Sequence, residues 1–155
     1  MSAPHDVCIR GAGITGTTLA LLLARDRLRV ALVRQPPRAD AAPDVRAYAL
    51  NAASRQLLES VRAWPSGDGA TPVLAMQVHG DDGGEVTFSA QQQNAPALAW
   101  IVDVPALERE LAEAARYQPL IEVVDAPVPA ALTVVCEGRA SATRAEFGVA
   151  FDTTP

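Results

Sequence analysis

The N-terminal part of the chain combines short apolar runs with a helical repeat of apolar positions. Residues 7–10 (VCIR) and 29–33 (RVALV) are short runs that predict buried strands, and residues 14–25 between them predict a helix. The positions expected to share the buried face of this helix are Thr15, Leu19, Leu22 and Leu23. A strand, a helix and a second strand in this order indicate a βαβ unit.

The middle of the chain has a different pattern. Asn51 is a typical N-cap, and the apolar stripe after it predicts a helix over residues 52–62. Two short runs, residues 73–79 and 85–89, flank an acidic turn with glycines and therefore predict a β-hairpin. Because antiparallel strands interrupt the βαβ pattern, we expect residues 73–102 to be an insertion that belongs to a second, substrate-facing sheet.

The remaining elements return to the alternation of strand and helix. Residues 100–102 predict a strand, and Asp103 is the expected cap of a helix that follows it. Two further strands are predicted at residues 121–124 and 132–136. The pattern as a whole predicts an α/β fold, a Rossmann-like domain with part of a second, antiparallel sheet.

Three glycines lie between the first strand and the first helix, at the spacing of a dinucleotide-binding turn. Gly11 allows the sharp exit from the strand, Gly13 lets the backbone approach a pyrophosphate, and Gly16 lets the helix pack closely on the strand. Ile14 and Thr15 open the helix, where unpaired N–H groups and the helix dipole favour negative charge. The turn therefore predicts a nucleotide site, although a purely structural glycine turn is the alternative.

Two arginines depart from this fingerprint. The acid that binds the adenosine ribose is expected about 20 residues beyond the glycines, and Arg34 occupies that place. An arginine cannot accept hydrogen bonds from ribose hydroxyls. With Arg38 it could meet a ribose 2′-phosphate, as in an NADP site, or it could be a solvated residue at a strand end. Arg10, directly before Gly11, either adds charge beside the pyrophosphate or indicates that the site has drifted.

Length and charge narrow the class of protein. The 155 residues are enough for one domain, and the hydrophobic content of 49% indicates a globular chain, which we interpret as one truncated nucleotide-binding domain (1–155). The net charge of −5 argues against nucleic acid as a partner. No apolar run approaches the roughly 20 residues that a transmembrane helix needs, which leaves peripheral membrane contact as an open alternative.

Cysteine and histidine offer no metal site. Cys8 and Cys136 lie in apolar, strand-like segments, as small buried side chains do in a reducing cytoplasm. His5 and His79 are isolated, with no second ligand at metal-binding spacing. We therefore expect a cytoplasmic protein without a bound metal.

Three segments together resemble a known family, the FAD-dependent aromatic-ring monooxygenases. They are DVCIRGAGITGTTLALLLARDRLRVALV, RAYALNAASRQLLESVRAWP and VVCEGRASATRAEFGV. The subgroup they resemble most is the ubiquinone-biosynthesis hydroxylases, relatives of para-hydroxybenzoate hydroxylase. The resemblance implies that the glycine turn holds the FAD pyrophosphate, that Arg46 lies near the flavin, and that Glu137 and Gly138 match an Asp-Gly motif serving FAD and NAD(P)H.

The chain also departs from the family pattern. Arg34 replaces the ribose-binding acid, Glu137 is one methylene longer than the usual aspartate, and Pro105 stands where the family tends to have arginine or glutamine. Residues 116–132 are shorter than usual, as if a hairpin had been lost. Family members are considerably longer, with a later Gly-Asp motif, so the resemblance implies an N-terminal portion of a longer protein.

Two classes of function follow. The first is an FAD-dependent monooxygenase that hydroxylates an aromatic or quinol-precursor substrate with NAD(P)H and oxygen, inactive as this chain alone and completed by its missing C-terminal half or by a homo-oligomer. No residue stands out as catalytic. The second is a non-catalytic nucleotide-binding module, or a decayed paralogue, that acts as a partner subunit. An NADP-dependent oxidoreductase using Arg34 and Arg38 is a third, weaker reading.

Overall fold

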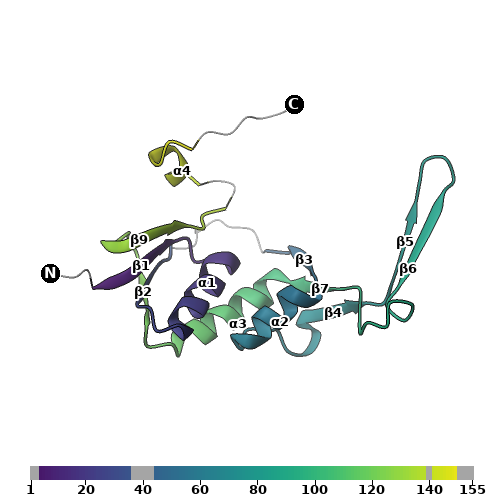
Figure 1. Ribbon diagram of the computed structural model, residues 1–155, viewed down its shortest axis with the longest axis horizontal. Helices are drawn as coiled ribbons and strands as arrows, with labels where there is room; N and C mark the ends of the chain where they lie inside the picture. Colours follow the sequence, from purple (N-terminus) through teal and green to yellow (C-terminus); the bar gives the residue numbers. More distant parts are fainter. Residues whose placement is uncertain (1–3, 36–43, 139–140, 150–155) are drawn as a thin grey trace. The chain divides into compact units, whose positions relative to one another are not determined.

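The computed structural model describes residues 4–35, 44–138 and 141–149. The chain divides into two compact units (Figure 1). One unit combines Met1–Ala41 with Leu111–Pro155, and the other is Ala42–Glu110. The first contains a parallel sheet and the second contains antiparallel sheets, so the predicted α/β fold class is confirmed.

The first unit is built on a four-stranded parallel sheet with the strand order β8-β2-β1-β9 (Figure 1). Its elements are β1 (His5–Arg10), α1 (Ile14–Arg25), β2 (Val30–Val33), β8 (Ile121–Val124) and β9 (Ala130–Val135). The predicted bounds of α1 and β8 are confirmed, and the other strands differ from prediction by one or two residues at one or both ends. The central strands β1 and β2 are largely buried, whereas the edge strands β8 and β9 are partly exposed.

Helix α1 buries its small residues more completely than the leucines that its sequence pattern places on one face. The buried residues are Gly16, Thr17, Ala20, Leu21 and Ala24. Thr15 is exposed and Leu22 is half-buried, whereas the half-buried Leu19 and Leu23 pack against the core, so the predicted face is right in part. Small side chains form the centre of the contact because they let the helix lie close to the sheet, where Ala20 packs with Ile9 and Leu32. The larger leucines then fill the sides.

The connection between β8 and β9 is unusually short for two strands on opposite edges of one sheet. Only residues 125–129 join Val124 to Ala130, whereas parallel strands normally need a crossover of a dozen or more residues. Val124 lies level with the end of β9, so the link must cross about 14 Å of sheet and descend about 17 Å along it. That diagonal is close to the roughly 22 Å that six fully extended residue steps can span.

The link also covers one face of the sheet. Successive strand residues point to opposite faces, and the face that α1 leaves free carries Cys8, Ala31 and Val33. Val128 of the link packs against this group. Small residues such as Cys8 and Ala31 suit a face that is crossed by a single short segment.

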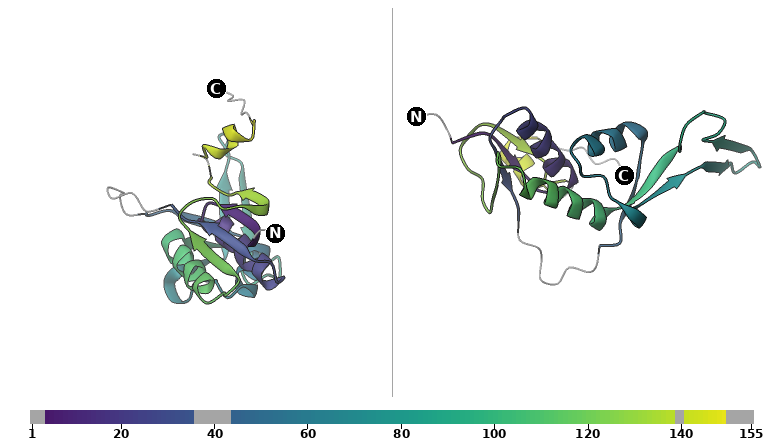
Figure 2. Two further views of the ribbon diagram at one scale, coloured as in Figure 1. Left: turned by 90° about the vertical axis from the view of Figure 1, so that its left-hand side faces the viewer. Right: turned by 90° about the horizontal axis from the view of Figure 1, so that it is seen from below.

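The second unit contains a three-stranded antiparallel sheet, β3-β7-β4, and a two-stranded hairpin, β5-β6 (Figure 2). Its strands are β3 (Ala47–Leu50), β4 (Ala70–Val73), β5 (Ala75–His79), β6 (Glu85–Ser89) and β7 (Ala99–Asp103). It also holds α2 (Ala52–Ser60) and the short 3₁₀ helix η1 (Gly67–Gly69). The prediction differs here in two ways: β3 and most of β4 were not expected, and the strand predicted at 73–79 is interrupted at Leu74, where the chain passes from one sheet to the other.

Helix α2 is anchored by a capping bond and by an aromatic pair. The side chain of Asn51 accepts a hydrogen bond from the Ser54 backbone N–H at 2.9 Å, as its position predicts. The Arg55 guanidinium lies 4.7 Å from the centre of the Trp100 ring and 5.3 Å from that of Trp64. The two indoles meet edge to face. Arg55 therefore fastens the helix to the first residues after it and to β7.

Two helices complete the described chain. Helix α3 (Val104–Arg116) begins at its predicted cap, because the Ala106 N–H donates a 2.9 Å hydrogen bond to the Asp103 carboxylate. Helix α4 (Thr143–Glu146) is a single turn after β9. In the part of the chain that the structure describes, no helix is long and apolar enough to cross a bilayer.

Candidate nucleotide-binding site

The topology of the first unit indicates one position that is typical of ligand binding. From β1 the chain proceeds to β2 and then to β8 at one edge, and afterwards returns to place β9 on the other side of β1. The strand order therefore reverses between β1 and β9. Open α/β sheets bind ligands outside the carboxyl ends of their strands at such a switch point, and the glycine turn follows directly from the carboxyl end of β1.

The three glycines of the turn impose three different constraints. Gly11 has a φ of +112°, and a Cβ on it would lie 2.5 Å from the Cys136 carbonyl oxygen. A Cβ on Gly16 would lie 1.9 Å from the carbonyl oxygen of Gly11. No atom lies within 4 Å of the position that a Cβ on Gly13 would occupy. The backbone of the turn thus excludes side chains at two positions and faces open space at the third.

The start of α1 offers unused hydrogen-bond donors beside this open space. Gly13 is the N-cap residue and provides no side-chain cap, and the first turn contains no acidic residue. The first backbone N–H groups of a helix, here those of Ile14, Thr15 and Gly16, have no partner within the helix. A diphosphate fits these donors and the positive end of the helix dipole, so the residues present fit the phosphate part of a dinucleotide.

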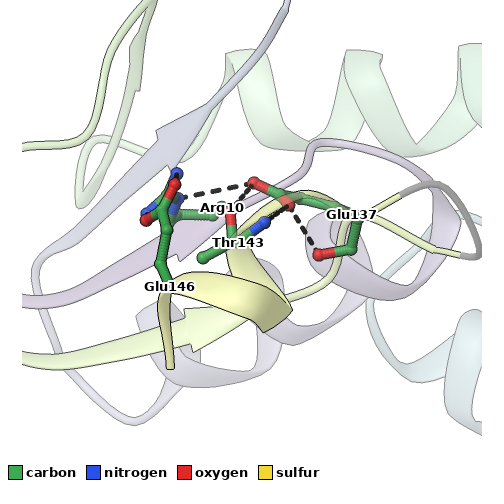
Figure 3. Close-up of polar contacts among 5 residues, drawn as sticks. Arg10, Glu137, Thr143 and Glu146 are labelled. Atoms are coloured by element: carbon green, nitrogen blue, oxygen red, sulfur yellow. Dashed lines mark hydrogen bonds and ion pairs between the residues drawn. The ribbon is translucent and has the colours of Figure 1, made fainter. Parts of the chain in front are cut away.

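A hydrogen-bonded carboxylate lies at the end of β9, beside the turn. Glu137 accepts hydrogen bonds from the hydroxyls of Ser141 (2.7 Å) and Thr143 (2.6 Å), and its second contact with Thr143 is to the backbone N–H at 3.4 Å (Figure 3). The Arg10 Nε lies 3.4 Å from the same carboxylate. The hydroxyl of Thr143, followed by the other donors and Arg10, lowers the pKa of Glu137. Glu137 is therefore the capping acid of the α4 segment.

The Arg10 guanidinium contacts two carboxylates, those of Glu137 and Glu146. Its Nη1 donates to Glu146 at 2.8 Å and its Nη2 to the same carboxylate at 3.5 Å (Figure 3). The hydrogen bond with Glu146 raises the pKa of Arg10. The side chains of Arg10 and Glu137 are 20% and 15% exposed, whereas that of Glu146 is 57% exposed. No sequence pattern predicted this pairing, although two hydroxyl residues shortly after Glu137 are a local signal for side-chain capping.

The other predicted site residues lie apart from this network. Arg34 follows β2, where its backbone N–H donates to the Val124 carbonyl at 2.9 Å. Its side chain is exposed and makes no ion pair or hydrogen bond with another described residue. Arg38 lies outside the described residues. Gly138 has a φ of +74° and open space around it, so the chain turns there in a conformation that favours glycine.

Arg46 belongs to the second unit, where it precedes β3. Its guanidinium binds Asp44 through two contacts, Nε to Oδ1 at 2.9 Å and Nη2 to Oδ2 at 2.6 Å. These hydrogen bonds lower the pKa of Asp44 to about 2. Among the residues 4–35, 44–138 and 141–149, no group of three or more His, Cys, Asp and Glu side chains could hold a metal ion.

The first unit is an α/β fold with a glycine turn after its first strand, and comparisons with known proteins show what this chain resembles. No protein-family model matches the chain. It is 29% identical over 124 residues to 3-demethoxyubiquinol 3-hydroxylase of Escherichia coli (strain K12), an alignment covering 76% of this chain and 32% of that protein. The chain is therefore similar to this hydroxylase over about a third of that protein's length.

Solved structures share the fold. PqsL of P. aeruginosa in complex with 2-aminobenzoylacetate has a TM-score of 0.77 and 21% identity, with 97% of this chain and 48% of that chain covered. The flavin-dependent monooxygenase PieE in complex with FAD and substrate has a TM-score of 0.67 and 18% identity, covering 97% of this chain and 33% of that chain. The chain thus spans between a third and a half of the length of these relatives.

Proposed function

We propose that this chain is the nucleotide-binding part of an FAD-dependent monooxygenase that hydroxylates an aromatic or quinol-precursor substrate with NAD(P)H and oxygen. The observation that carries the proposal is the glycine turn, which leaves Gly13 open beside an uncapped helix N-terminus. The homology to a ubiquinol-precursor hydroxylase supports the substrate class. Bound FAD would supply the oxygen-activating chemistry, for which the protein provides binding and orientation.

The residues of the turn have separate parts in binding. The N–H groups of Ile14, Thr15 and Gly16 would hold the FAD diphosphate, and the missing side chain of Gly13 gives the diphosphate access to them. Gly11 and Gly16 keep the turn in shape, since any side chain there would collide with backbone. These donors need no proton transfer, so this part of the chain orients the cofactor without taking part in the chemistry.

The remaining proposed contacts come from outside the turn. Arg34, at the end of β2, would lie near the adenosine ribose, where it offers donors but no acceptor. Arg46 would lie near the flavin, and Glu137 and Gly138 would border the diphosphate from the end of β9. No described residue is proposed as catalytic. The hydroxylation is proposed for a protein of the relatives' full length, to which this chain contributes cofactor binding.

A titration with FAD, followed by flavin fluorescence, tests the proposal. We expect saturable binding by the parent protein and a loss of at least about tenfold in affinity for Gly13→Val, because the new side chain occupies the space of the diphosphate. Gly84→Val is the matched control: Gly84 has open space around it in the hairpin turn, and its replacement should leave FAD affinity unchanged. A folded parent that does not bind FAD in large excess would contradict the proposal.

A non-catalytic nucleotide-binding module, or a decayed paralogue acting as a partner subunit, is the second candidate. It is favoured by the arginine in place of a ribose-binding acid. FAD binding without any FAD-dependent NAD(P)H oxidation by the full-length protein would support it. A parallel titration with NADPH distinguishes these two candidates from an NADP-dependent oxidoreductase, which should bind NADPH rather than FAD.

A further inference from the structure

The peptide that carries Glu137 forms one wall of the glycine turn. A Cβ on Gly11 would lie 2.5 Å from the Cys136 carbonyl oxygen and 2.9 Å from the Glu137 nitrogen. The Cys136 N–H donates a 2.7 Å hydrogen bond to the carbonyl of Arg10. The ends of β1 and β9 are therefore joined through their backbones, and Arg10 and Glu137 are fixed on either side of the joint.

This arrangement poses an electrostatic problem for the turn. A diphosphate brings two negative charges to a place whose wall carries a carboxylate that is only 15% exposed. Like charges in a poorly solvated place repel strongly, because the effective dielectric constant is low. A nearby cation on the carboxylate removes most of this repulsion, and Arg10 lies in contact with it.

We propose that Arg10 is a positioning residue of the nucleotide site: its guanidinium neutralises Glu137 and so lets a diphosphate bind in the adjoining glycine turn. This inference rests on the proposed function, and it assigns Arg10 no direct contact with the nucleotide. Glu146 holds the other side of the guanidinium through two contacts and keeps Arg10 oriented toward the end of β9.

The contacts of Glu137 argue against a direct role as an acceptor for the nucleotide. One carboxylate oxygen accepts from the Thr143 hydroxyl and faces the Arg10 Nε. The other accepts from the Ser141 hydroxyl and the Thr143 N–H. Both oxygens are engaged within the protein, so the charge of Glu137, rather than its hydrogen-bonding capacity, is what the ligand would experience.

Variants in which glutamine or lysine replaces a charged side chain of this network test the inference. The measured quantity is FAD affinity, followed by flavin fluorescence. Arg10→Gln should weaken FAD binding roughly tenfold, since it leaves Glu137 uncompensated. Arg10→Gln/Glu137→Gln should return the affinity to within about twofold of the parent, because the repulsion is then removed. Arg10→Gln/Glu146→Gln is the matched control and should not recover, and Arg10→Lys, which keeps the charge, should bind as the parent does.

Each result decides for or against the inference. An unchanged affinity in Arg10→Gln, or a recovery by the Glu146 change instead of the Glu137 change, would overturn it. Glu137→Gln alone, which keeps an amide for the Ser141 and Thr143 hydroxyls, should bind FAD at least as tightly as the parent. A loss of about tenfold or more in that variant would show that the carboxylate binds the nucleotide directly. If the folded parent binds no FAD, the proposed function itself fails. If the parent binds FAD and Arg10→Gln binds it equally well, only the inference about Arg10 fails.

Discussion

At the scale of single residues, Arg34 is the position where the chain differs most clearly from a nucleotide site of the usual kind. The strand end where it lies is where an acid accepts hydrogen bonds from the ribose. Arg34 is held there by its backbone, while its side chain is exposed. A site with donors for the phosphates and no acceptor for the ribose should bind FAD more weakly than a site that has an acidic residue at this place.

Arg34→Glu should therefore tighten FAD binding by roughly threefold to tenfold, because a carboxylate at this place can accept from the ribose hydroxyls. Equilibrium titration with FAD measures the effect. Arg109→Glu, an exposed change in the second unit with the same charge difference, controls for net charge. Weaker FAD binding by Arg34→Glu would show that Arg34 itself contacts the cofactor. Loss of NADPH binding instead would favour the 2′-phosphate reading.

At the scale of elements, what the sequence could predict depended on whether the signal was local. Helix α1 and strand β8 were predicted with their observed bounds because their signals are local: the glycine turn leads directly into α1, and β8 is a short, mostly apolar run. Strand β3 was missed because its residues are mostly exposed and its partner β7 lies about 50 residues further along the chain. The same reason explains which parts of the site could be predicted. The glycine turn is a local sequence pattern, whereas the pairing of Arg10 with Glu137 depends on β9 lying beside β1.

The cap of α2 allows a local contribution to be measured. Asn51→Ala should lower the free energy of unfolding by about 1 kcal/mol, since it removes the acceptor of the Ser54 N–H. Ser66 is a matched control, because it occupies the N-cap position of η1 without making a side-chain capping bond. Ser66→Ala should change stability little. Urea unfolding of both variants measures the difference, and equal values would show that the Asn51 bond adds nothing.

At the scale of the whole molecule, the Glu137 network predicts how stability depends on pH. The pKa of Glu137 is lowered in the folded protein from 4.5, its value without these contacts. Its stabilising contribution is therefore fully present above about pH 4.5 and is lost as the pH falls through the folded-state pKa. Glu137→Gln cannot titrate, so the parent should lose more stability than this variant between pH 6 and pH 3.

Urea or thermal unfolding of the two proteins across this range measures the difference directly. Asp6 and Asp44, whose pKa values are also lowered by arginine partners, titrate in both proteins and cancel in the comparison. Parallel curves for parent and variant would contradict the assignment of the Thr143 and Arg10 contacts to Glu137.

The length of the link between β8 and β9 restricts where β9 can lie along β1. Each residue removed from it would shorten its reach by about 3.5 Å, which is close to one step along a strand. Strand β9 would then have to slip by a residue against β1, and such a slip turns every side chain of the strand to the other face. Glu137 would leave Arg10 at the same time. Shortening this link would therefore disturb both the register of β9 and the contact between Glu137 and Arg10.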